Sequence, residues 1–328
     1  MASIRQRAGK WQARILRKGY PAETRSFDTR AQAVRWAREV ESAIDRRAYC
    51  NHSGIDDLPL RELMTRYMSE VSPTKRGGKD EVIRILALRR HRIASYSLAT
   101  VTPADVAALR DERLGRVAAG TVIRELAMLS SIINHARREW GAVSTNPCAL
   151  VRRPRAPQGR NRLLSTEEEA RLLWELAPSG RRNPLMRPLV IVALETAMRR
   201  GELLALRWRH IDLALQVALL EITKNGEGRA VPLSRRAVET LRRMGEGEPS
   251  DRVFPIGEAA LHAAFKRACH RAGLEDFHFH DLRHCAATRL SAKLPNVLEL
   301  SAVTGHRTLQ MLKRYYHPNP AALAAKLG

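Results

Sequence analysis

The sequence predicts a mainly helical fold with small β elements. Apolar residues recur at helical spacing through most of 58–316, and the clearest case is an apolar stripe within 119–140. That stripe consists of Val122, Leu126, Leu129, Ile133 and Ala136. Strand signals are confined to short alternating runs near the N-terminus and to two runs joined at Asn225-Gly226, a dipeptide typical of a tight β-hairpin. The predicted fold is therefore a small N-terminal β-plus-helix module followed by α-rich domains, the last of which contains a small β-hairpin sheet.

Residues 1–50 are expected to form a separate β-plus-helix unit. Residues 11–17 and 24–27 alternate as short strands do, and Asp28 or Thr29 can cap a helix over 30–47. One face of that helix collects Ala33, Trp36, Ala37, Val40 and Ile44. The unit is rich in basic residues, which fits either a DNA-contact module or a solvated basic face.

A helical bundle is expected over 58–150, after a polar linker at 51–57. The predicted helices span 58–71, 79–95, 103–115 and 119–140. Thr102, Pro103 and Asp105 start the third helix, with a capping hydroxyl, a proline at the first helical position and an acid in the first turn. The bundle is expected to end at Asn146-Pro147.

Residues 151–162 are expected to form an extended basic linker. The segment contains two prolines, a glycine and no acidic residue, and proline-rich segments favour extended chain. Its five arginines are Arg152, Arg153, Arg155, Arg160 and Arg162. We expect them to contact DNA phosphates; the alternative is an ordinary solvated linker.

A third domain is expected over 163–317. A capping box at Ser165 and Glu168 opens it. Predicted helices follow at 166–177, 184–198, 201–207, 234–245, 257–272, 281–293, 296–303 and 308–316, with strands at 217–223 and 229–233. The tail at 318–328 contains a short apolar helix, which can pack on its own domain or on a neighbouring protomer.

Charge makes a polyanion the expected partner. The chain has 57 Lys and Arg against 34 Asp and Glu, a net charge of +23 spread over its length. Nucleic acid is the commonest partner of such a protein, and an anionic membrane surface is the competitor. The longest apolar run, 189–194, is far shorter than a membrane span, and the N-terminus lacks the apolar core of a secretion signal. We therefore expect a cytoplasmic protein that does not insert into a membrane.

The four cysteines fit the same compartment. Cys50, Cys148, Cys269 and Cys285 are scattered and form no C-x-x-C pair. Free thiols in a reducing environment are expected rather than a disulfide framework.

Several side chains in the last 130 residues suit chemistry on a phosphodiester. A catalyst without metal must neutralise the non-bridging oxygens, and arginine matches their geometry and keeps its charge. Arg199 follows an apolar helix, with Glu202 placed to orient it, and Arg283 lies in H-D-L-R. Lys224, on the predicted hairpin tip, can reach into a groove and donate a proton to a leaving oxygen. Taken singly, each of these residues also fits a surface role.

The histidines and tyrosines complete the candidate set. His278, His280 and His284 lie close together, but no fourth ligand has conventional zinc spacing, so no metal site is predicted. His280 is expected to handle a proton or bind phosphate, and His284 to be structural. Tyr315 and its neighbour Tyr316 have Arg and His on either side, and such cations can activate a phenol as a nucleophile. The alternative is a pair of core or interface aromatics.

The ordered set resembles the tyrosine recombinase (phage integrase) family. That family carries arginine in T-G-x-R-x-x-E, a hairpin lysine, H-x-x-R, a G-H box, and a tyrosine nine residues after the G-H histidine. The matching residues are Arg199 with Glu202, Lys224, His280, Arg283, His306 and Tyr315. The spacing selects Tyr315 over Tyr316, and Ala197 stands where glycine is usual. The match is specific over about 163–317, and the chain also resembles shufflon-type DNA invertases and phage-like integrases.

The resemblance extends more loosely to the rest of the chain. Residues 58–150 look like the helical core-binding domain of the family, and 1–50 faintly resemble an arm-type DNA-binding module. It implies a homotetramer on two double-stranded DNA sites, with accessory DNA-bending proteins as further partners.

The implied activity is site-specific recombination for integration, excision or inversion of DNA. Tyr315 would attack a scissile phosphate and form a 3′-phosphotyrosyl bond. Arg199, Arg283 and His306 would hold the phosphate oxygens. His280 would assist proton transfer and Lys224 would protonate the 5′-oxygen. The covalent bond conserves the energy of the phosphodiester, so no cofactor, metal or ATP is implied.

Two other classes compete with this interpretation. A type IB topoisomerase-like enzyme would use nearly the same residues to relax DNA without pairing sites. A non-catalytic DNA-binding regulator would not need the complete residue set.

Overall fold

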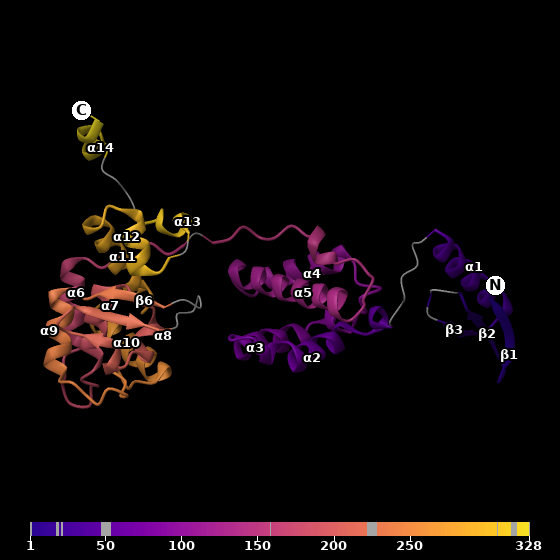
Figure 1. The fold of residues 1–328 in the computed structure, drawn as a ribbon, viewed down its shortest axis with the longest axis horizontal. Coiled ribbons are helices and arrows are strands. Elements are labelled where there is room, and N and C mark those ends of the chain that lie inside the picture. Colours follow the sequence, from indigo (N-terminus) through magenta and orange to yellow (C-terminus); the bar gives the residue numbers. More distant parts are fainter. Residues whose placement is uncertain are drawn as a thin grey trace. The chain divides into compact units, whose positions relative to one another are not determined.

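The mainly helical class with small β elements is confirmed. The computed structural model describes residues 2–17, 20, 22–46, 54–157, 159–221, 228–306, 308–315 and 320–327. The chain forms two compact units, Met1–Gln158 and Gly159–Gly328 (Figure 1). Among the described residues, each unit contains one β-sheet of three antiparallel strands. No helix within the described ranges is both long and apolar enough to cross a membrane.

The N-terminal sheet consists of β1 (Ser3–Arg7), β2 (Lys10–Ile15) and β3 (Glu23–Phe27), in that order. Strand β1 was not expected from the sequence, because nearly all its positions are exposed and its hydrophobicity does not alternate. It pairs with β2 from Ser3 opposite Arg14 to Arg7 opposite Lys10, which places a two-residue turn at Ala8 and Gly9. Both turn residues have positive φ, as tight hairpins between twisted strands require.

Helix α1 (Arg30–Asp45) packs against this sheet. Thr29 caps it, and Gln32 completes a capping box. The expected apolar face is confirmed: Ala33, Ala37 and Ile44 are buried, with Trp36 and Val40 packed beside them. A small core of their own therefore holds these strands and this helix together.

The second core belongs to a helical bundle. Its elements are η1 (Ile55–Asp57), α2 (Leu60–Glu70), η2 (Ser72–Thr74), α3 (Gly78–Arg89), η3 (Arg92–Ser95), α4 (Pro103–Leu114), α5 (Ala119–Glu139) and η4 (Pro147–Leu150). All five residues of the predicted stripe on α5 are buried, which confirms that face as core. Thr102 and Asp105 form the capping box of α4, with Pro103 at its first position.

Three bundle boundaries differ from the prediction. Helix α3 ends at Arg89 rather than 95, because the His91 ring accepts a hydrogen bond from Ile93 N and starts η3. The end of the predicted linker is part of the bundle: buried Asp56 accepts hydrogen bonds from the backbone N–H groups of Val143 and Ser144. Element η4 adds a turn beyond the expected end, and its Cys148 is buried in the bundle core. Residues 51–53 lie outside the described part of the chain.

The second unit is α-rich around a small sheet. Its helices are α6 (Thr166–Glu175), α7 (Met186–Thr196), α8 (Arg200–Ala205), η5 (Trp208–His210), α9 (Arg235–Met244), α10 (Glu258–Arg271), α11 (Asp281–Lys293), α12 (Val297–Thr304), α13 (Leu309–Leu312) and α14 (Pro320–Leu327). Its strands are β4 (Ile211–Asp212), β5 (Val217–Leu220) and β6 (Arg229–Pro232), ordered β4-β5-β6. The short β4 was not expected, and α13 is shorter than the helix predicted over 308–316.

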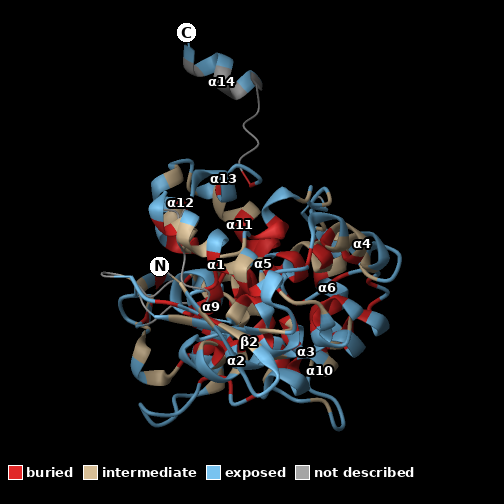
Figure 2. Cartoon of the chain, turned by 90° about the vertical axis from the view of Figure 1, so that its right-hand side faces the viewer, coloured by how far each residue is buried: buried red, intermediate tan, exposed pale blue. Residues whose placement is uncertain are grey.

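Helix α7 is the centre of this unit. It contacts α6, α8, α9, α10 and α11, and seven of its eleven residues are buried. Buried positions gather along the inner faces of the helices while the outer faces stay exposed (Figure 2). The helix ends at Thr196 and is capped by Ala197, whose φ of 53° is left-handed. Because glycine adopts that conformation most readily, the glycine usual at this position in the resembled family has a physical explanation.

Candidate active site

Four predicted site residues come together in the second unit. Arg199 precedes α8, Arg283 lies in the first turn of α11, His306 follows α12 and Tyr315 follows α13. Hydrogen bonds connect Arg199 to the Gly305 carbonyl and Arg283 to His306, and a ring contact connects His306 to Tyr315. Three segments far apart in the sequence thus meet at one place.

Arg283 is the most deeply buried member, with 5% of its surface exposed. Its Nη1 donates to the Ala197 carbonyl at 2.5 Å, and its Nη2 donates to the Thr304 carbonyl at 2.6 Å. Burial, followed by the charge of Arg199, lowers the pKa of Arg283 to about 10, so the guanidinium stays charged at neutral pH. A cation held by carbonyl dipoles rather than by a carboxylate keeps its net charge for an anionic ligand.

Arg199 shares buried Glu202 with a second arginine that the sequence analysis did not select. Arg199 Nη1 donates to Glu202 Oε1 at 2.8 Å, and its Nη2 donates to the Gly305 carbonyl at 3.0 Å. Arg229, at the start of β6, binds both Glu202 oxygens at 3.0 and 2.8 Å and also donates to the Val303 carbonyl. Burial opposes ionisation of Glu202, but the two arginines outweigh it and hold its pKa at about 2. One carboxylate charge therefore faces two guanidinium charges, and the group of three side chains keeps a net positive charge.

His306 has both ring nitrogens engaged. Arg283 Nη2 lies 3.3 Å from Nε2, and the Thr304 hydroxyl lies 2.7 Å from Nδ1. Because a guanidinium only donates, Nε2 must accept and the ring proton must sit on Nδ1. Burial and then the charge of Arg283 lower the His306 pKa to about 3, so the ring is neutral here.

The Tyr315 side chain is buried, with its hydroxyl 2.9 Å from Nδ1 of His284. Ala287, Leu300 and Leu312 pack around the tyrosine. Burial raises the Tyr315 pKa, while the charges of Arg283 and Arg314 oppose that rise. Tyr315 is therefore a phenol in this arrangement. His284, expected to be merely structural, is in direct contact with the candidate nucleophile.

His280 lies at the edge of this cluster, as the N-cap residue of α11. Its ring contacts the His284 ring edge-on at 5.6 Å. The residue is exposed, yet neighbouring atoms partly desolvate its ring, and this desolvation, followed by the charge of Arg283, lowers its pKa. Within the described ranges no three His, Cys, Asp or Glu side chains group as metal ligands do.

Lys224 and the predicted turn at Asn225-Gly226 lie outside the described residues, as does Tyr316. The strands that lead to that turn are described, and Leu220 pairs with Arg229 at the end of the ladder. The described part of β5 therefore ends beside the arginine that binds Glu202.

The linker arginines divide into two groups. Arg160 binds Asp276 and buried Asp281, and Arg162 binds Glu168. The guanidinium groups of these two arginines are therefore paired with carboxylates of their own unit. We call the other three the outer linker arginines; they are Arg152, Arg153 and Arg155, and their side chains are exposed.

Two residues in the cluster, Arg229 and His284, were missed at the sequence level. Arg229 carries no local signal in a chain so rich in arginine, and its partner is 27 positions away. His284 did carry one: it lies four residues after His280 and next to Arg283, so helical spacing puts it beside the candidate cluster.

A buried tyrosine beside arginines and histidines, on an α-rich domain with a small three-stranded sheet, defines a tyrosine recombinase catalytic domain. The model of the phage integrase family matches residues 162–322. The Escherichia coli shufflon-specific DNA recombinase is 42% identical over 282 residues, which cover 83% of this chain and 72% of that protein. A putative integrase/recombinase of Haemophilus influenzae is 34% identical, covering 98% of this chain and 88% of the relative. The chain belongs to the phage integrase family.

Solved structures share the fold. The Tn1549 transposon integrase in complex with circular intermediate DNA superposes with a TM-score of 0.68 at 16% identity, covering 83% of this chain and 99% of that one. A lambda integrase tetramer bound to a Holliday junction gives 0.64 at 22% identity, covering 94% and 95%. At these identities the likeness establishes the fold.

Proposed function

We propose that this protein is a site-specific DNA recombinase that cuts and rejoins strands through a phosphotyrosyl bond to Tyr315. The observation that carries the proposal is the buried Tyr315 hydroxyl beside a cluster of arginines with surplus positive charge. A phosphodiester at this cluster would meet a nucleophile on one side and fixed positive charge around its oxygens. The names of the relatives, a recombinase and an integrase, point to the same activity, so relaxation by a type IB topoisomerase is not favoured.

Arg199, Arg283 and His306 form the proposed phosphate cradle. The backbone carbonyls of Ala197, Thr304 and Gly305 fix the two guanidinium groups before any ligand arrives. Such preorganisation stabilises charge that develops in the transition state at little reorganisation cost. For His306 to donate to the phosphate from Nε2, that nitrogen must gain a proton and its contact with Arg283 Nη2 must be replaced by the phosphate, while Arg283 keeps its two carbonyl partners.

His280 and Lys224 complete the proposed chemistry. His280, which is exposed beside the cluster, would assist proton transfer. Lys224, on the segment between β5 and β6, would protonate the departing 5′-oxygen. No cofactor, metal or ATP takes part in this proposal, since the phosphotyrosyl bond stores the energy needed for rejoining.

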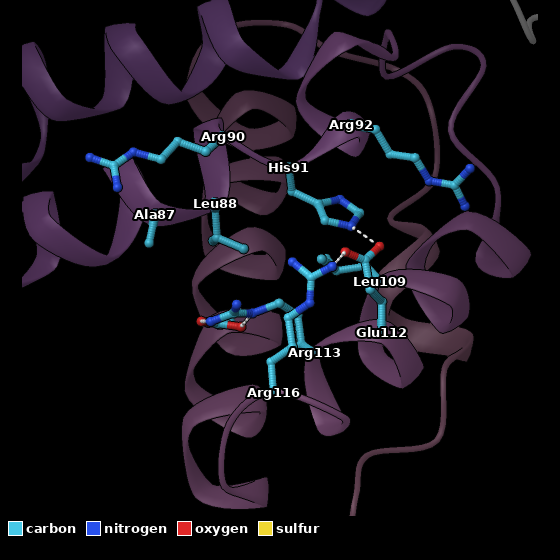
Figure 3. Close-up of a pocket in the computed structure, with 10 residues that line it drawn as sticks. Ala87, Leu88, Arg90, His91, Arg92, Leu109, Glu112, Arg113 and Arg116 are labelled. Atoms are coloured by element: carbon cyan, nitrogen blue, oxygen red, sulfur yellow. Dashed lines mark hydrogen bonds and ion pairs between the residues drawn. The ribbon is translucent and has the colours of Figure 1, made fainter.

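The remaining parts of the chain are assigned to DNA. Residues 58–150 would be the core DNA-binding domain, 151–162 the linker, 163–317 the catalytic domain and 1–50 an arm-type module. The outer linker arginines would contact phosphates, as would Arg90 and Arg92. These two extend from the rim of a hollow in which Glu112 binds His91 and Arg113 binds Glu125 (Figure 3).

Double-stranded DNA is the proposed partner, bound by a homotetramer on two sites. The supporting observation is the fold shared with a lambda integrase that is a tetramer on a Holliday junction. The tail at 318–328 would pack on its own domain or on a neighbouring protomer, and accessory DNA-bending proteins would assist. A cytoplasmic location belongs to the same proposal, because a DNA substrate and free thiols at Cys148, Cys269 and Cys285 both fit it.

A nicked suicide duplex tests this function. The duplex that the wild-type protein traps from a randomised pool is incubated without metal and run on a denaturing gel. A covalent protein–DNA band should form with the wild-type protein and be absent with Tyr315→Phe. A band that persists in the Tyr315→Phe variant refutes the assigned nucleophile, and failure of the wild-type protein to trap any duplex refutes the activity.

A further inference from the structure

The contact between His284 and Tyr315 lies outside the residue set that the family motif selects. The Tyr315 hydroxyl is 2.9 Å from Nδ1 of His284, and the two residues expose only 6% and 9% of their surfaces. A phenol so poorly exposed to water has few other acceptors for its proton. Arg314 also hydrogen-bonds the hydroxyl, but a guanidinium has no acceptor site.

The geometry of this pair is fixed from both sides. His284 follows Arg283 directly on α11, so the proton acceptor and a phosphate-binding arginine move as one rigid element. The Tyr315 backbone is held to the same helix, because the Ser291 hydroxyl donates to the Tyr315 carbonyl at 2.7 Å. The hydroxyl is therefore presented to His284 by main-chain contacts as well as by packing.

The other two histidines are less suitable acceptors. Both ring nitrogens of His306 are taken by Arg283 and Thr304. His280 reaches the tyrosine only through the His284 ring, which it contacts edge-on.

The charges around His284 keep it neutral. Burial lowers its pKa first, and the positive groups nearby lower it further. The charged and titratable groups that surround it are His280, Asp281, Arg283, His306, Arg314 and Tyr315. A neutral ring that accepts at Nδ1 carries its proton on Nε2.

We propose that His284 holds the Tyr315 hydroxyl for attack and takes up its proton as the phenolic oxygen bonds to the scissile phosphorus. The inference rests on the proposed function. In the forward step the O–H bond of Tyr315 breaks, the proton passes to His284 Nδ1, the tyrosyl O–P bond forms, and the P–O5′ bond breaks as Lys224, in its proposed role, gives a proton to the 5′-oxygen. On rejoining, a 5′-hydroxyl attacks and returns its proton to the neutral Lys224, the phenolate leaves, and His284 returns the stored proton to the phenolate. His284 is thus base in one direction and acid in the other.

A first experiment needs no DNA. In protein with ¹⁵N-labelled histidine and ¹³Cζ-labelled tyrosine, NMR should show His284 as the Nε2–H tautomer. The Tyr315 Cζ signal, assigned with Tyr315→Phe, should move in His284→Ala and return towards the wild-type position in His284→Asn, whose amide oxygen can accept the same hydrogen bond. The proposal is overturned if His284 is the Nδ1–H tautomer, or if the Tyr315 Cζ signal is unchanged in both His284→Ala and His284→Asn. Either result counts whether or not the protein cuts DNA.

A second experiment measures proton uptake. Single-turnover trapping on the suicide duplex should slow by roughly 100-fold or more in His284→Ala, the range typical of general base catalysis. His284→Asn should stay slow, because an amide positions the hydroxyl but does not accept its proton. His262→Ala, an exposed histidine of α10, is the matched control and should trap at the wild-type rate.

A 5′-bridging phosphorothiolate duplex separates attack from departure of the leaving group. A sulfur leaving group needs no acid, so the His284→Ala defect should persist on it. Rescue by sulfur would make His284 the acid for the leaving group instead. The proposal would also be overturned if His284→Ala trapped DNA at a rate within threefold of wild type, or if His284→Asn recovered the full wild-type rate. A covalent band in Tyr315→Phe would instead refute the proposed function itself.

Discussion

Replacing Glu202 with glutamine should destabilise the second unit in a pH-dependent way. The carboxylate is 8% exposed and is bound by Arg199 and by both arms of Arg229. Glutamine keeps the size of the side chain but removes the charge that balances two guanidinium groups. Removing one partner of a buried ion pair typically costs several kcal/mol, because the remaining charge is left uncompensated.

The magnitude follows from the pKa of Glu202. It falls from an ordinary 4.5 to about 2 in the folded protein. At about 1.4 kcal/mol per pKa unit, that shift stabilises the fold by ~3 kcal/mol at neutral pH. Because the folded-state pKa lies below the unfolded value, this stabilisation is complete above about pH 4.5 and is lost as the pH falls through about 2.

Urea unfolding measured from pH 7 to pH 2 tests this expectation. Trp208 packs against the core of the second unit and can serve as the reporter in a background where the other four tryptophans are phenylalanine. The gap in unfolding free energy between wild type and Glu202→Gln should be ~3 kcal/mol or more at pH 7 and should close between pH 4.5 and 2. Glu258→Gln, whose exposed carboxylate binds Arg200, is the control and should show a much smaller gap.

The reasoning would be refuted by either of two results. A Glu202→Gln protein as stable as wild type at pH 7 would mean that the two arginines do not depend on this carboxylate. If the difference in unfolding free energy between wild type and Glu202→Gln stayed constant down to pH 2, the two arginines would not be stabilising an ionised Glu202 carboxylate as the lowered pKa implies.

Three further changes should have measurable effects. Ala197→Val should destabilise the protein strongly, since a β-branched residue is strained at positive φ. Ala197→Gly should change the unfolding free energy by less than ~1 kcal/mol, because relief of backbone strain offsets the lost burial of the methyl group. Thermal unfolding of the two variants distinguishes these outcomes. Asp281→Asn should weaken the ion pair that holds Arg160 and speed tryptic cleavage after that arginine. Asp276→Asn, which removes the exposed partner of Arg160, should have less effect. Equal cleavage rates in the two variants would contradict a dominant role of Asp281 in holding Arg160. Alanine at all three outer linker arginines should reduce the slope of log binding constant against log salt by about 0.9 per lost phosphate contact, so an unchanged slope would remove these residues from the DNA contact.

Sequence patterns predicted the helices of the two large cores well, because those helices are long, amphipathic and capped by local signals such as Thr102 and Ser165. They missed β1 and β4, since one is exposed along almost its whole length and the other has two residues. Such strands are fixed by backbone pairing with a neighbour, which leaves no periodic mark in the sequence. The end of α3 was missed for a related reason: it is set by the ring of His91 and not by a glycine or proline.

The candidate site shows the same division. Arg199, Arg283, His306 and Tyr315 were predicted as a group, and the fold brings them together. Contacts between distant segments, such as Arg229 with Glu202, leave no spacing rule in the chain; the spacing of His284 placed it near the cluster but could not show its contact with Tyr315.

Backbone carbonyls as the partners of Arg283 have a consequence for how this protein can diverge. A carboxylate partner can be lost by one codon change, but the carbonyls of Ala197 and Thr304 survive any substitution that leaves the main-chain path intact. Drift at position 197 is therefore restricted by conformation and space rather than by side-chain chemistry, whereas position 304 must also keep the hydroxyl that contacts His306. Lysine offers its donors from one nitrogen and lacks the planar fork whose two nitrogens each bind a different carbonyl, so position 283 has no conservative replacement. In distant relatives the arginine should persist while the side chains around its anchor points vary.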